Sequence, residues 1–164
     1  MLKSVQVTKP FISKQFSAEQ LFMVTMLVVN GGNYLYNLIL GRLLGPEAFA
    51  DAAILITFLL ILSFIGMTFQ IVTTKYVVIY TFRKRIAFIR LMTKYALFSG
   101  IVLGLIIIAS CNLLQKVFHT QSASMFVLFG AGIPLYFLMS VNRGIYQGKN
   151  NFFNLSRTYT SEMI

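Results

Sequence analysis

The sequence predicts an all-α fold, a polytopic bundle of membrane-spanning helices, and two observations carry this prediction. Four stretches contain no Asp, Glu, Lys or Arg, and they cover residues 21–41, 52–74, 95–115 and 120–142. At about 1.5 Å of rise per residue, each stretch as a helix would cross the ~30 Å hydrocarbon core of a bilayer. The composition agrees, because 57% of the residues are hydrophobic and 11% are charged, against about 25% charged in soluble proteins.

The net charge of +10 is distributed in alternate loops. The 75–94 loop carries +6 with no acid, and the segments before the first span and after the fourth carry +2 each. The 42–51 loop carries −1, and Lys116 adds +1 before the fourth span. The positive-inside rule then predicts a cytoplasmic N-terminus. We expect membrane lipids, and no nucleic acid, as the partners of the basic residues.

The chain divides into a cytoplasmic lead-in, residues 1–16, and a partial transmembrane domain, residues 17–164. The expected spans are about 20–44, 49–78, 93–115 and 121–146, with the start of a fifth segment from about 152. Ser17 and Gln20 fit a capping box at the start of the first helix, and Gly45-Pro46 predicts its end. Glu47 suits the start of the second helix.

Three local patterns refine this bundle. The 75–94 loop interleaves basic and apolar residues, which suits a helical connector lying on the inner leaflet. Gly100 and Gly104 form a GxxxG pattern that favours close approach of a neighbouring helix. Pro134 lies inside the fourth span, where proline bends a helix.

A polar stripe runs along the first span. Asn30, Asn33 and Asn37 recur at helical spacing, and Tyr34 lies on the same face. Amides without partners are costly in hydrocarbon, so this face is expected to meet other helices or a water-filled cavity. Interhelical hydrogen bonding and a hydrophilic translocation cavity both fit the stripe.

The second span carries a similar face at its inner half, with Ser63, Gly66, Gln70 and Thr74 at helical spacing. Ser63 and Thr74 can bond to carbonyls of their own helix. The Gln70 amide is harder to satisfy in that way, so Gln70 is a candidate for a second wall of the same cavity.

Charged residues at the span ends have two interpretations. Arg42 and Arg143 are expected to extend to lipid phosphates, and the alternative is that they bind an anionic head group of a substrate. Glu47 and Asp51 suit a negative helix start better than an acid and base pair. We expect no catalytic residues, no metal site and no cofactor, because the enzyme motifs are absent and Cys111 is the only cysteine.

Two runs resemble a known family. Residues 33–49, NYLYNLILGRLLGPEAF, are similar to the first-helix exit and outer turn of bacterial polysaccharide-unit flippases. These flippases belong to the multidrug, oligosaccharidyl-lipid and polysaccharide exporter superfamily. Residues 143–152, RGIYQGKNNF, resemble the cytoplasmic end of the family's fourth helix.

The resemblance implies a 12–14-helix transporter of the bacterial cell (inner) membrane, with two lobes, that moves a lipid-linked oligosaccharide between leaflets. The chain would then supply part of the first lobe, be inactive alone, and need the missing C-terminal helices as partners. The alternatives are a multidrug or lipid-precursor exporter of the same superfamily, a membrane-embedded glycan polymerase or ligase, and a structural membrane subunit. A polymerase or ligase needs a substantial outer loop, and the expected outer loops are short.

Overall fold

A computed structural model describes residues 18–163, and within them the chain is helical with no strand. The helices are α1 (Ala18–Leu43), α2 (Gly45–Ile79), α3 (Phe82–Ala109), α4 (Cys111–Phe118), α5 (Ser124–Gly148) and α6 (Phe152–Met163). The predicted all-α class is therefore confirmed for this part of the chain. Ser17, the proposed cap of the first helix, lies outside the described residues.

Three of these helices, α2, α3 and α5, are long and apolar enough to cross a membrane. The chain thus has the helix lengths and composition of a membrane protein. The sequence predicted four spans, and α1, with 26 residues, is not among the three. Its length is sufficient, but Asn30, Asn33 and Asn37 interrupt its apolar character.

The turn between α1 and α2 follows the sequence signals. α1 ends at Leu43, and Gly45 has a φ of 75°, a left-handed conformation that glycine adopts without steric cost. Pro46 follows in the first turn of α2, where its missing N–H leaves no helical bond unmade. The predicted helix end at Gly45-Pro46 is confirmed.

The predicted surface connector at 75–94 is wrong. α2 continues to Ile79, α3 already begins at Phe82, and the basic residues therefore lie on the ends of two long helices. Ring contacts hold these ends together, because the Tyr76 ring lies 5.1 Å from the Tyr80 ring and 4.9 Å from the Phe88 ring, centroid to centroid. The Phe88 ring of α3 thus packs against the end of α2, whereas Phe82, Ile86 and Leu91 stay exposed.

The third span also ends earlier than expected. α3 ends at Ala109, and the short helix α4 follows after Ser110. His119 ends α4 in a left-handed conformation, with a φ of 53°. The Phe118 ring packs edge-on against the Phe58 ring of α2 at 5.6 Å, so α4 folds back toward the bundle instead of extending α3.

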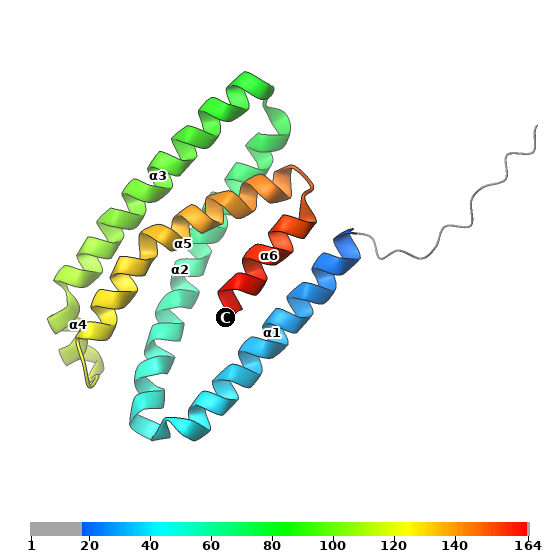
Figure 1. The fold of residues 1–164 in the computed structure, drawn as a ribbon. Helices are drawn as coiled ribbons and strands as arrows, with labels where there is room; N and C mark the ends of the chain where they lie inside the picture. The colour runs from blue at the N-terminus through cyan, green and yellow to red at the C-terminus, as the bar shows by residue number, and fades with distance from the viewer. Residues whose placement is uncertain (1–17, 164) are drawn as a thin grey trace, which may run out of the picture.

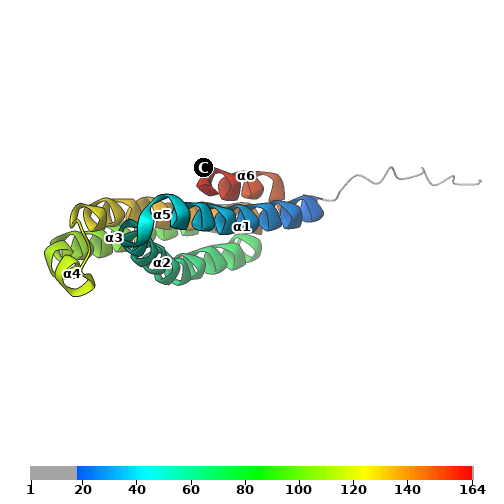
Figure 2. The same ribbon diagram turned by 90° about the horizontal axis from the view of Figure 1, so that it is seen from below.

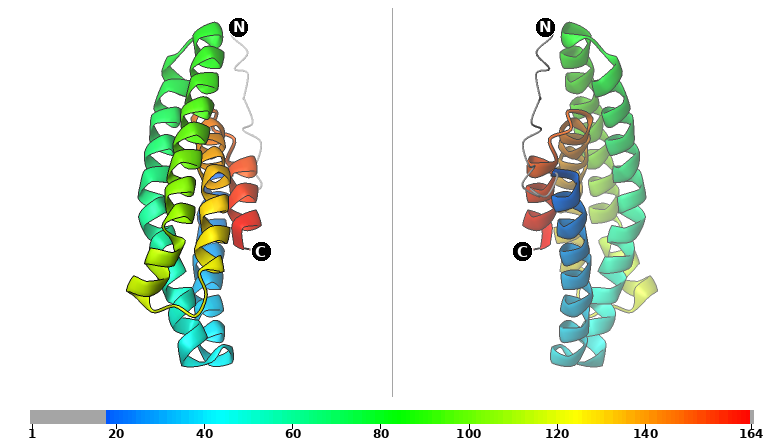
Figure 3. Two further views of the ribbon diagram at one scale, coloured as in Figure 1. Left: turned by 90° about the vertical axis from the view of Figure 1, so that its left-hand side faces the viewer. Right: turned by 90° about the vertical axis from the view of Figure 1, so that its right-hand side faces the viewer.

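α2, α3 and α5 form one layer, and α1 and α6 form a pair that packs beside it. α5 lies between α2 and α3 and makes the main packing contacts of both (Figure 1). α6 packs against both α1 and α5 and lies to one side of them, and α1 packs chiefly on α6 (Figure 2, Figure 3). The core of the layer is apolar and consists of Leu62, Ala96, Ile133, Phe137 and Val141.

Glycines set the spacing between α3 and α5. A Cβ at Gly104 would lie 2.5 Å from the Gly130 carbonyl oxygen, and a Cβ at Gly100 would lie 2.7 Å from the Pro134 Cα. Both separations are too short for a side chain, so the backbones of the two helices touch. The prediction that the GxxxG pattern supports close packing is confirmed, with α5 as the partner. The helix bend expected at Pro134 stays a prediction.

Candidate functional site

A polar junction joins α2, α5 and α6 in an otherwise apolar bundle, and Gln70 lies at its centre. The Gln70 Nε2 donates to the Gln147 Oε1 at 2.9 Å and to the Tyr159 hydroxyl oxygen at 3.4 Å. The Thr74 hydroxyl donates to the Gln70 carbonyl oxygen at 2.8 Å and lies 3.3 Å from the Gln147 Oε1. We call these four side chains, with Arg143, the polar junction.

Small residues on α5 allow this approach. A Cβ at Gly144 would lie 2.5 Å from the Gln70 carbonyl oxygen, and a Cβ at Gly148 would lie 2.9 Å from the Thr74 carbonyl oxygen. Ser140, one turn earlier, has its Oγ 2.7 Å from the position of a Cβ at Gly66. Residues 140, 144 and 148 therefore form a small-residue stripe on the face of α5 that meets α2.

Arg143 is buried, with 4% of its surface exposed. Its guanidinium lies 4.0 Å from the centroid of the Tyr159 ring, and its Nη2 donates to the Thr158 carbonyl oxygen at 3.1 Å. A cation over an aromatic face gains electrostatic energy, more so when it is removed from water. The side chain therefore packs between α5 and α6. The expectation that Arg143 extends to lipid phosphates is wrong. Arg42, in the last turn of α1, is exposed.

The α1 stripe is largely unpartnered. Asn30, Asn33 and Tyr34 are exposed, and Asn37 is half-buried. The Asn37 Nδ2 donates to the Asn33 carbonyl oxygen of the same helix at 2.9 Å. Within residues 18–163, no hydrogen bond joins these asparagine side chains to another helix. The interhelical bonding that the sequence allowed is thus not made by the described helices.

The two predicted cavity walls are not brought together directly. Gln70 bonds to Gln147 and Tyr159, and the Tyr159 ring lies 5.9 Å from the Phe22 ring of α1. α6 therefore stands between Gln70 and α1. A cavity shared by Gln70 and the α1 stripe stays a prediction.

The sequence reasoning did not single out Gln147 and Tyr159 as partners of Gln70. The spacing of Ser140, Gly144 and Gly148 was the available signal, because small residues every four positions indicate a close helix contact. Nothing in the sequence indicated that α6 folds back along α5 and brings Tyr159 to Gln70. The expectation that Ser63 and Thr74 bond to their own helix is confirmed, with Ser63 donating to the Leu60 carbonyl oxygen at 2.6 Å.

At the opposite end, two acids hold the loop before α5. The Glu47 Oε2 accepts from the Gln121 Nε2 and the Asp51 Oδ2 accepts from the Gln121 backbone N–H, both at 3.1 Å. Glu47 lies in the first turn of α2, as predicted. Both carboxylates accept hydrogen bonds from Gln121 in this loop, which fits a structural role better than an acid and base pair.

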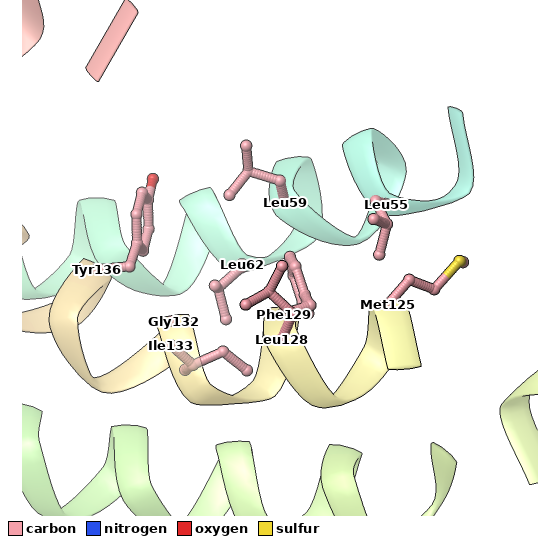
Figure 4. Close-up of a pocket in the computed structure, with 9 residues that line it drawn as sticks. All are labelled: Leu55, Leu59, Leu62, Met125, Leu128, Phe129, Gly132, Ile133 and Tyr136. Carbon is pink, nitrogen blue, oxygen red and sulfur yellow. The ribbon is translucent and has the colours of Figure 1, made fainter. Parts of the chain in front are cut away.

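Pockets of two kinds line the bundle. One of about 340 Å³ lies between α2 and α5 and is lined chiefly by apolar side chains such as Leu59, Phe129 and Ile133 (Figure 4). Another, of about 310 Å³, lies between α5 and α6 and is lined by polar side chains. Among the described residues, no group of His, Cys, Asp or Glu is placed to hold a metal ion.

The fold and the site define the chain as an all-helical protein with three helices suited to crossing a membrane. Comparison with protein-family models, curated proteins and solved structures gives no match. The resemblance to polysaccharide-unit flippases therefore stays a prediction, and function is argued from the residues and their arrangement.

Proposed function

We propose that the chain is part of a membrane transporter that moves lipid-linked oligosaccharide units across a bacterial cell membrane for polysaccharide synthesis. The observation that carries the proposal is the face of α1 that bears Asn30 and Asn33, both exposed. The resemblance of residues 33–49 and 143–152 to flippases supports the same reading. No bond is made or broken in this activity, so no catalytic residue is required.

The physical argument starts from the cost of an amide in hydrocarbon. Each amide that is removed from water without a partner costs several kcal/mol, roughly 2–7. The described helices offer Asn30 and Asn33 no side-chain partner, so a membrane location requires water, further helices or a polar ligand at this face. Sugar hydroxyls donate and accept hydrogen bonds, and an asparagine amide does both.

The orientation follows from charge. The proposed cytoplasmic end carries the basic residues at the α2–α3 turn, and the opposite end carries Glu47 and Asp51. Under the positive-inside rule this distribution gives a cytoplasmic N-terminus. A multidrug or lipid-precursor exporter would share this orientation and differ in its substrate.

The test uses Asn33→Leu in the full-length gene, expressed in cells that lack the original copy. We expect surface polysaccharide to fall several-fold while the amount of protein in the membrane stays unchanged. Asn33→Gln, which keeps the amide, should retain more activity. Val28→Leu, an exposed apolar position on the same helix, is the matched control. Normal polysaccharide in Asn33→Leu cells would contradict the proposal.

Gln70→Leu should behave differently. Gln70 is hydrogen-bonded to Gln147 and Tyr159, so its loss should lower membrane abundance together with surface polysaccharide.

Asn33→Cys, in a Cys111→Ser background, distinguishes a water-filled cavity from a packed interface at this face of α1. Labelling by a water-soluble thiol reagent supports the cavity, and no labelling from either side of the membrane excludes it.

A further inference from the structure

One face of α6 is polar along its length and opens into a pocket. Asn154, Arg157, Thr158 and Ser161 recur at spacings of three, one and three residues, which places them within about 100° around the helix. Together with Tyr146 of α5, they line the pocket of about 310 Å³ between α5 and α6. The pocket between α2 and α5, in contrast, is lined chiefly by apolar residues.

The hydrogen-bonding groups in this pocket are mainly unused donors. The Thr158 hydroxyl donates to the Leu155 carbonyl oxygen at 2.7 Å, and the Ser161 hydroxyl donates to the Thr158 carbonyl oxygen at 3.0 Å. The side chains of Arg157, Asn154 and Tyr146, however, make no hydrogen bond or ion pair within residues 18–163. A guanidinium, an amide N–H and a phenolic hydroxyl are therefore available to one ligand.

The charge of the pocket favours an anion. Arg157 is exposed and brings a permanent positive charge, and none of the described lining residues is acidic. The planar guanidinium matches the oxygens of a phosphate group and can donate two parallel hydrogen bonds to it. Phosphate is thus the anion that these donors fit best.

The position of the pocket points to a lipid as the carrier of this phosphate. The α5–α6 turn lies toward the end of the bundle where α2 and α3 join (Figure 1). That end also carries the cationic side chains of Lys75, Arg83, Lys84 and Arg85. If α2, α3 and α5 cross the membrane, the pocket lies near the head groups of one leaflet, where anionic lipids meet basic residues.

We propose that the pocket between α5 and α6 binds the phosphate of an anionic lipid, with Arg157 as the main contact and Tyr146 and Asn154 as further donors. The site is separate from the α1 stripe and does not depend on the transported substrate. It gives α6 a second attachment, through the lipid, in addition to the Arg143 and Gln70 contacts.

The experiment measures lipid binding to the purified, delipidated chain by native mass spectrometry. Phosphatidylglycerol is titrated against the unsubstituted protein, Arg157→Gln and Lys116→Gln, where Lys116 is an exposed lysine in the last turn of α4. We expect Arg157→Gln to weaken binding about tenfold, in line with a hydrogen-bonded charge. Lys116→Gln should leave the affinity for phosphatidylglycerol unchanged.

Three further measurements separate the alternatives. Tyr146→Phe should weaken phosphatidylglycerol binding by a smaller factor, which keeps the test valid if Arg157→Gln lowers the melting temperature. Equal affinity for phosphatidylcholine would overturn the proposal of an anionic lipid. Displacement of the lipid by millimolar inorganic phosphate would overturn it in favour of a soluble anion, and unchanged binding by Arg157→Gln would refute the site.

Discussion

The contact between α2 and α5 predicts a large difference between two glycine substitutions in the same helix. Gly144→Ala would place a Cβ 2.5 Å from the Gln70 carbonyl oxygen and 2.7 Å from the Thr73 Cβ. Gly132→Ala, the matched control, would meet no heavy atom within 4 Å. Both changes gain the same helix propensity, about 1 kcal/mol for Gly to Ala. The difference between the two variants is therefore the cost of overpacking, about 1–3 kcal/mol.

The assay is thermal unfolding of both variants in the same detergent, followed by circular dichroism. A difference of about 2 kcal/mol corresponds to a melting temperature on the order of 4–8 °C lower for Gly144→Ala than for Gly132→Ala in a chain of this size. Gly132→Ala itself should unfold at or above the original temperature. Equal melting temperatures for the two variants would refute backbone contact between α2 and α5.

Two further predictions concern the ends of the bundle. Tyr159→Phe removes the hydroxyl that contacts Gln70 and should lower the melting temperature slightly. Tyr159→Ala also removes the ring beneath Arg143 and should lower the melting temperature several times more. Similar melting temperatures for both variants would contradict the cation–π contact. Gln121→Ala removes the side-chain amide that donates to Glu47 and leaves the backbone bond to Asp51 in place. Hydrogen exchange in the α4–α5 loop should rise, with no change at the α5–α6 turn. Unchanged exchange in the loop would contradict the Gln121–Glu47 bond.

The parts of the fold that follow from local chemistry could be predicted from the sequence. Gly45-Pro46 fixes the end of α1, because only glycine adopts that φ without cost and proline suits the first turn of a helix. Gly100 and Gly104 indicated a close helix contact. The helical class follows from the long apolar stretches alone.

The parts that depend on distant contacts could not be predicted. The 75–94 segment has the pattern of a surface helix, but stacking of Tyr76, Tyr80 and Phe88 extends α2 and α3 toward each other instead. Arg143 has the sequence position of a residue that reaches lipid, and only the return of α6 supplies the Tyr159 ring that covers it. Gln70 was identified as a polar residue in need of partners, but Gln147 and Tyr159 are 77 and 89 residues away in the chain.

The central position of α5 has a mechanical consequence. Its N-terminal half touches α3 backbone to backbone at Gly130, and its C-terminal half touches α2 in the same way at Gly144. At both contacts a backbone carbonyl oxygen meets a glycine, beside the side chains of Ile108 and Thr73, and little space is left for a sliding motion. We therefore expect α2, α3 and α5 to move as one body. α6 is held to that body by side chains, chiefly Gln70 and Arg143, which can exchange partners. Movement within this chain is therefore expected at the joint with α6, and α1 moves with α6.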